Sequence, residues 1–131
     1  AWSEEEIRGH AIEFRINAED PAHGFRPAPG RIERFRPALG PGIRIDTFME
    51  DGASVPPFYD SMIAKLIVSA PNRESALQRS ARALDEFEIV GIPTTLPLLR
   101  EIVDEPRFRA GRYTTTYIDE VGASLTTLGE A

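Results

Sequence analysis

Residues 9–21 read GHAIEFRINAEDP, and this stretch decides the fold. Apolar and polar side chains alternate strictly within it: Ile12, Phe14 and Ile16 fall on one face, and Glu13, Arg15 and Asn17 on the other. A period of two is typical of a β-strand with one buried face. We therefore expect a strand over 10–17 with its apolar face against the core.

Three later segments also predict strands. Residues 43–48 alternate in the same way, and 62–68 form a continuous apolar run typical of a buried strand. In 31–36 the apolar residues Ile32 and Phe35 are out of phase, which indicates a strand with a bulge or an early end. Turns rich in proline and glycine separate these segments. The sequence thus predicts one largely antiparallel sheet made of these three strands and the first.

Helical patterns follow the strands. Asn72 is expected to cap a helix that runs to about Phe87 and buries one face at helical spacing. The other elements expected are a short strand at 89–92, a helix from Thr94 or Thr95 to about Val103, a single turn at 107–110 and a short helix over 114–121. Strands followed by helices predict an α+β fold, a largely antiparallel sheet followed by packed helices.

Composition limits the classes of protein. A chain of 131 residues with 41% hydrophobic content is of a size to form one domain. The net charge of -6 argues against nucleic-acid binding, and no apolar run is long enough to span a membrane. The absence of cysteine excludes disulfides and thiolate metal sites. We expect a cytoplasmic protein.

Motifs for several chemistries are absent. The sequence has no glycine-rich phosphate loop, no dinucleotide fingerprint and no serine nucleophile elbow. His10 and His23 have no acidic partner at a metal-ligand spacing, so we expect no metal site. Five arginines and one glutamate give residues 21–45 a local charge of +4, which faces an anion or is simply solvated.

Three features remain as candidate sites. The polar face of 10–17, which continues to Glu19 and Asp20, holds a ligand or pairs with neighbouring strands. Arg44 stands between two isoleucines on a predicted strand, directly after a Pro/Gly turn, and is either a rigidly held anion ligand or a brace for the strand. Asp60 orients a cation or caps a turn. On the residues alone, the chain is an α+β domain with an anion site as one reading.

The same stretch that decides the fold resembles the opening signature G-H-A-x-E-x-R-x-x-A-E-D-P of the biotin carboxylase C-terminal domain. Three further motifs of that family follow in order: PAPGRI at 27–32, PGIRID at 41–46 and FYDSMIAKLI at 58–67. The resemblance extends to about residue 121. It predicts a biotin carboxylase C-terminal domain over 9–122, with an N-terminal flank at 1–8 and a C-terminal tail at 123–131.

This resemblance implies an activity and a site. Enzymes of the family use ATP with Mg and bicarbonate to carboxylate biotin on a carrier domain. Arg44 matches the arginine of the family's P-G-x-R motif, which contacts bicarbonate and the ureido oxygen of biotin, so we expect Arg44 to be catalytic and substrate-binding. Thr115 falls where the family closes over the adenine and is the expected nucleotide-binding residue.

The resemblance also implies partners. The family's ATP-grasp core lies N-terminal to the signature, and none of its motifs occurs in these 131 residues. We therefore expect the isolated segment to bind none of these cofactors alone and to be inactive. The expected partners are the ATP-grasp core of the same enzyme, the biotin carboxyl carrier domain, the carboxyltransferase and a second copy in a homodimer.

The enzyme that contains the domain is left open. We expect an acyl-CoA carboxylase, acting on acetyl-CoA or propionyl-CoA and linked to fatty acid biosynthesis. Pyruvate carboxylase and a urea-linked biotin enzyme are alternatives, because acceptor specificity resides in a different domain. A rival from another class is a stand-alone module that binds an anion or a protein through the arginine-rich segment.

Overall fold

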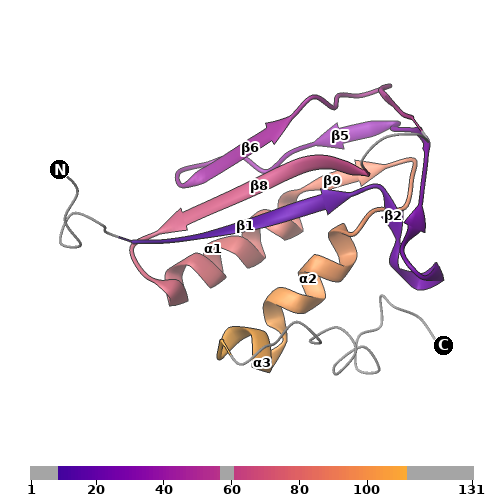
Figure 1. Ribbon diagram of the computed structural model, residues 1–131. Helices are drawn as coiled ribbons and strands as arrows, with labels where there is room; N and C mark the ends of the chain where they lie inside the picture. Colours follow the sequence, from indigo (N-terminus) through magenta and orange to yellow (C-terminus); the bar gives the residue numbers. More distant parts are fainter. Residues whose placement is uncertain (1–8, 57–60, 112–131) are drawn as a thin grey trace, which may run out of the picture.

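A three-stranded antiparallel sheet forms the centre of the computed structural model, which describes residues 9–56 and 61–111. Its strands are β1 (His10–Asn17), β8 (Met62–Ala70) and β6 (Ile43–Thr47), and β8 lies between the other two (Figure 1). Each of the three was predicted from its pattern, to within two residues at either end. The predicted α+β class with a largely antiparallel sheet is confirmed.

The other strands form short two-stranded ladders outside this sheet. The three antiparallel pairs are β2 (Glu19–Asp20) with β3 (Arg26–Pro27), β4 (Gly30–Arg31) with β7 (Ser54–Val55), and β5 (Arg34–Arg36) with β9 (Glu88–Val90). A 3-10 turn, η2 (Pro21–His23), connects β2 to β3.

The prediction of one strand over 31–36 within the main sheet is wrong. The chain changes partner in the middle of that segment: the amide of Ile32 donates to Ala53 O, and the amide of Glu33 donates to Val90 O, both at 2.8 Å. A turn between two ladders explains why Ile32 and Phe35 are both buried although they are three residues apart. The out-of-phase pattern marked this change and not a bulge.

The helices follow the predictions closely. They are α1 (Arg73–Glu86), α2 (Leu96–Asp104) and α3 (Pro106–Arg109). The side chain of Asn72 caps α1 by accepting from the amide of Ser75 at 2.8 Å, as expected. Thr95 lies at the start of α2 but makes no capping hydrogen bond, because its hydroxyl accepts instead from the amide of Asn17 at 2.9 Å. The helix predicted over 114–121 lies outside the described residues.

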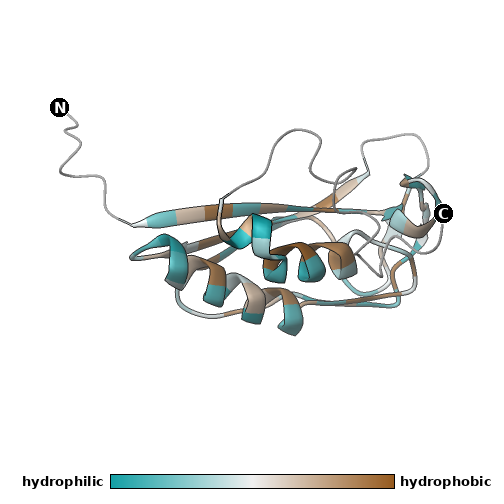
Figure 2. Ribbon diagram, turned by 90° about the horizontal axis from the view of Figure 1, so that it is seen from below, coloured by the Kyte–Doolittle hydropathy of each residue, from teal (hydrophilic) through white to brown (hydrophobic). Residues whose placement is uncertain are grey.

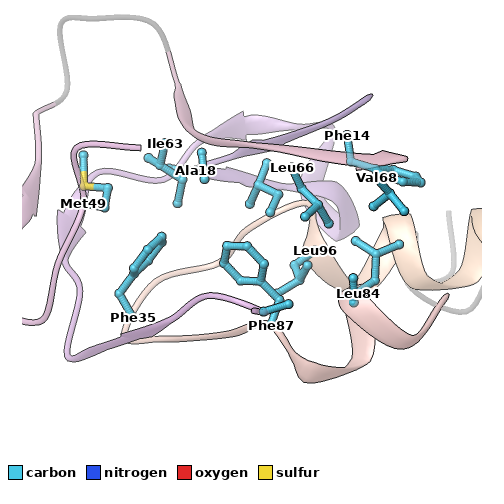
Figure 3. Packing of buried hydrophobic residues seen from close by; sticks show 14 of the residues in the cluster. Phe14, Ala18, Phe35, Met49, Ile63, Leu66, Val68, Leu84, Phe87 and Leu96 are labelled. Carbon is cyan, nitrogen blue, oxygen red and sulfur yellow. The ribbon is translucent and has the colours of Figure 1, made fainter. Parts of the chain in front are cut away.

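The core lies between the sheet and the helices. Both α1 and α2 are on one face of the sheet, and α1 contacts β1 and β8 (Figure 2). Phe14, Leu66 and Val68 point from the sheet into this layer, where Phe35 and Phe87 meet edge to face with ring centroids 5.6 Å apart (Figure 3). The sheet therefore has one buried face, as the alternation in 10–17 predicts. Among the described helices, none is long and apolar enough to cross a membrane.

Candidate active-site face

A glycine turn leads the chain into β6, the strand that carries Arg44. Gly42 has a φ of +73°, in the left-handed region that favours glycine. Its carbonyl accepts from the amide of Ser69 at 2.8 Å, which joins the turn to β8. A Cβ at this position would lie 2.5 Å from Ser69 O, and the side chain of Arg79 would be closer still. Only glycine fits here without displacing backbone.

A residue of helix α1 also contacts this turn. The guanidinium of Arg79 donates from Nη1 to the carbonyl of Ser69. Both backbone groups of Ser69 are therefore bound: its amide donates to Gly42, and its carbonyl accepts from Arg79. The turn before β6 thus has a defined place relative to both the sheet and the helix layer, and this fixes the start of the strand.

Arg44 lies two residues after the turn, on the face of β6 that points away from the core. Ile43 and Ile45 are half-buried on the inner face, whereas the side chains of Arg44 and Asp46 are 72% and 45% exposed. The guanidinium of Arg44 donates from Nε to Asp46 Oδ1 at 3.1 Å and from Nη2 to Asp46 Oδ2 at 3.3 Å. This is a two-point contact between one edge of the guanidinium and both carboxylate oxygens.

The pairing leaves part of the guanidinium available. Of the five N–H groups of an arginine, Asp46 uses one on Nε and one on Nη2. The second N–H on Nη2 and one of the two on Nη1 form another planar edge, which can bind a carboxylate-like anion at two points. Arg44 is therefore both paired and able to take a ligand.

Charged side chains surround Arg44 on this outer face of the sheet. Across the ladder, Lys65 of β8 is the direct partner of Asp46 on one side and of Arg15 on the other. Arg15 donates from Nε to Glu13 Oε1 at 3.0 Å, so the polar face of β1 pairs within itself. Ile67 of β8 stands opposite both Glu13 and Arg44. The face is open and carries both signs of charge.

The arginine-rich segment 21–45 does not form one anion-binding surface. Its arginines are divided among separate short ladders and β6. Arg34 donates to Glu88 Oε1 at 2.8 Å, and this hydrogen bond, with the charge of Glu88, raises the pKa of Arg34 above its ordinary value. Among the arginines of this segment, Arg44 is the one that lies on a strand of the three-stranded sheet.

The other residues singled out from the sequence are Thr115, Asp60 and the histidines. Thr115 and Asp60 lie outside the described residues. His23 pairs with Asp20, with Nδ1 and Oδ2 2.8 Å apart, beside a pocket of about 330 Å³ that Glu88, Thr94 and Arg100 also line. Within 9–56 and 61–111, no three His, Asp or Glu side chains gather in a way that could hold a metal ion.

Two contacts of the site could not be predicted from the sequence. Arg79 supports the Gly42 turn from 37 residues away along the chain, and a helix pattern carries no signal for such a contact. Lys65 faces Asp46 because of the register between β6 and β8. Alternation gives the face on which each residue lies, whereas register depends on how the two strands meet.

Comparison with known proteins identifies the family. A family model, the biotin carboxylase C-terminal domain, matches residues 13–120. The chain belongs to this family. The resemblance drawn from the four ordered motifs is thereby confirmed. Arg44, Asp46 and the Gly42 turn all lie within the matched part of this biotin carboxylase C-terminal domain.

Curated relatives are similar over most of the chain. The biotin carboxylase of Nostoc sp. is 50% identical over 115 residues, which are 88% of this chain and 26% of the relative. The 2-oxoglutarate carboxylase small subunit of Hydrogenobacter thermophilus is 49% identical over 121 residues, 91% of this chain and 26% of that subunit. The chain thus spans about a quarter of the length of these relatives.

A solved structure of the same family has the same fold. The biotin carboxylase domain of a thermophilic 2-oxoglutarate carboxylase, bound to bicarbonate, is 45% identical with a TM-score of 0.89, and the match covers 99% of this chain and 29% of that one. The biotin carboxylase subunit of a pyruvate carboxylase is 44% identical with a TM-score of 0.88, over 95% and 27% respectively.

Proposed function

We propose that this chain is the C-terminal part of a biotin carboxylase and completes the site where ATP and bicarbonate are used to carboxylate biotin on a carrier domain. Family membership together with the exposed, oriented guanidinium of Arg44 carries the proposal. A structure of the family contains MgADP and bicarbonate. Nucleotide, magnesium and biotin are therefore the cofactors proposed for the whole enzyme, and Thr115 stays a proposed nucleotide contact.

Arg44 is proposed to act on the anionic groups of the reaction. Carboxylation at the ureido nitrogen of biotin requires loss of a weakly acidic proton, so negative charge develops on the ureido oxygen. A guanidinium is protonated at any working pH, and here it is already oriented on a strand. A fixed cation beside developing charge stabilises the transition state more than the ground state.

The open sheet face, together with the segments that flank β6, is proposed as the surface that meets the rest of the enzyme. Leu39 before β6 and Phe48 after it are 80% and 77% exposed, and apolar side chains at such positions support contact with another part of a larger protein. The ATP-grasp core is the partner proposed for this surface. The carrier domain, a carboxyltransferase and a second copy in a homodimer are further partners, and one relative of known structure is a dimer.

The acceptor of the carboxyl group is a finer proposal. Relatives include a pyruvate carboxylase subunit, a 2-oxoglutarate carboxylase subunit and an acyl-coenzyme A carboxylase subunit of Mycobacterium leprae that is 50% identical over 98 residues. The acyl-CoA carboxylase expected from the sequence, with its link to fatty acid biosynthesis, thus stays a prediction beside the keto-acid enzymes. Cytoplasmic localisation is also still a prediction, since some relatives are chloroplastic.

The first prediction tests Arg44 in the complete enzyme. Arg44→Ala is expected to lower the rate of biotin carboxylation on the order of 10² to 10³-fold, about 3 to 4 kcal/mol, by analogy with loss of one oxyanion donor. Arg44→Lys restores only part of this rate because an ammonium lacks the planar edge. Nucleotide affinity is expected to change much less. Carboxylation rate, nucleotide affinity and melting temperature are measured together.

Two results contradict the assignment. One is an unchanged carboxylation rate in Arg44→Ala. The other is a loss of rate that unfolding of the variant fully accounts for, which would make Arg44 only a brace for β6. The exposed position of the side chain favours a small effect on folding.

A further inference from the structure

The pair between Arg44 and Asp46 is a poor device for stabilising the fold. Both side chains are largely open to solvent, at 72% and 45% exposure. An ion pair in such a place contributes little to stability, since solvent screens the charges and two side chains lose freedom. Yet the contact is a two-point one, which fixes the plane of the guanidinium as well as its position.

The same sheet face holds a second arginine–carboxylate pair that lacks this feature. Arg15 and Glu13 are also two residues apart on one strand and also partly exposed, but Arg15 uses Nε alone and reaches one oxygen of Glu13. A single contact allows the guanidinium to rotate about the hydrogen bond. The two pairs therefore have the same spacing but constrain their guanidinium groups differently.

Neighbouring positive charges stabilise the carboxylate of Asp46 in its position beside Arg44. Lys65 is its direct partner across the β6–β8 ladder, so cations flank it on the same strand and on the neighbouring one. Directly opposed side chains of unlike charge attract one another on a sheet. Within the described residues Lys65 has no ion pair that would draw it away from this position.

We propose that Asp46 is a positioning residue: it holds Arg44 by the Nε–Nη2 edge and presents the Nη1–Nη2 edge to the anionic ligand. This role rests on the proposed function of Arg44. It follows from the count of N–H groups, because the edge that Asp46 occupies is not the edge that remains for a ligand. Asp46 touches neither biotin nor bicarbonate and acts only through Arg44.

The experiment uses the complete enzyme and four variants: Asp46→Ala, Asp46→Glu, Arg44→Ala and the double variant Arg44→Ala/Asp46→Ala. Asp46→Ala is expected to lower kcat for biotin carboxylation on the order of 10 to 100-fold, because misplacing a catalytic group by about 1 Å has effects of this size. Asp46→Glu keeps a carboxylate and is expected to recover part of the loss. KM for ATP and the melting temperature are expected to stay close to those of the unmodified enzyme.

The double variant separates positioning from a structural role. If Asp46 acts only through Arg44, removing it has no further effect once Arg44 is gone, so the double variant has the rate of Arg44→Ala. Glu13→Ala is the matched control, since it removes a carboxylate of the same spacing from the same face, and its rate is expected to stay within about twofold of the unmodified enzyme.

Each result has one reading. An unchanged rate in Arg44→Ala overturns both the proposed function and this inference. A loss in Arg44→Ala with an unchanged rate in Asp46→Ala overturns the inference alone. Additive losses in the double variant, no recovery in Asp46→Glu, or a loss that follows the melting temperature likewise assign Asp46 to the fold and not to the site.

Discussion

At the scale of single residues, the position of Arg44 depends on Gly42. A side chain at Gly42 meets a strained φ and a clash with the Ser69 carbonyl, and that carbonyl is itself held by Arg79. Gly42→Ala is therefore expected to destabilise the domain by about 1 kcal/mol or more. For a domain of this size the melting temperature is expected to fall by roughly 4 °C or more.

Gly24→Ala is the control for this prediction. Gly24 has almost the same φ, +70°, but a Cβ there has no heavy atom within 4 Å. Both variants carry the backbone strain, and only Gly42→Ala carries the clash, so the difference between their melting temperatures measures the clash. An equal fall in melting temperature in both variants would show that the turn at Gly42 shifts to avoid the clash. The start of β6 would then be less firmly fixed than the contacts indicate.

The sequence predicted the faces of residues well and their contacts less well. Alternation placed Arg44 on the outer face of β6, and the resemblance assigned it a role. The same alternation puts Asp46, two residues away, on the same face as Arg44. Neither Arg79 nor Lys65 could be placed beside the site, since both meet it through the packing of distant segments.

At the scale of elements, α1 carries the clearest local signal and the clearest test. Asn72 accepts from the amide of Ser75 and so satisfies one of the free donors at the start of the helix. Asn72→Ala is expected to lower the free energy of unfolding by about 1 kcal/mol, measured by urea unfolding. Asn72→Asp keeps an acceptor and is expected to be close to neutral. Equal destabilisation by both would contradict a capping role.

Elements with strong local signals were predicted, and those that depend on distant partners were not. The pattern of α1, the apolar run of β8 and the alternation of β1 each occur within one segment. Segment 31–36 was assigned to the wrong sheet because its partners, β7 and β9, are two-residue and three-residue strands with little pattern of their own. Their pairing is settled by tertiary packing.

At the scale of the whole molecule, the two faces of the sheet have different tasks. One face closes the core against α1 and α2, and the other presents Arg44 on an open surface of charged side chains. A chain that spans about a quarter of its relatives' length and carries Arg44 on an open face fits the proposed role of one wall of a site whose other walls come from elsewhere. This arrangement predicts what the purified chain does alone.

The 131-residue chain is expected neither to hydrolyse ATP in the presence of bicarbonate nor to carboxylate free biotin. Phosphoryl transfer requires positioned metal ions and phosphate contacts, and the sequence has no phosphate-binding loop to supply them. The measurements are bicarbonate-dependent release of ADP and transfer of radiolabelled bicarbonate to biotin. The complete enzyme at the same molar concentration is the positive control. Bicarbonate-dependent ATP turnover by the purified chain, above the level without protein, would show that these residues hold a catalytic site of their own.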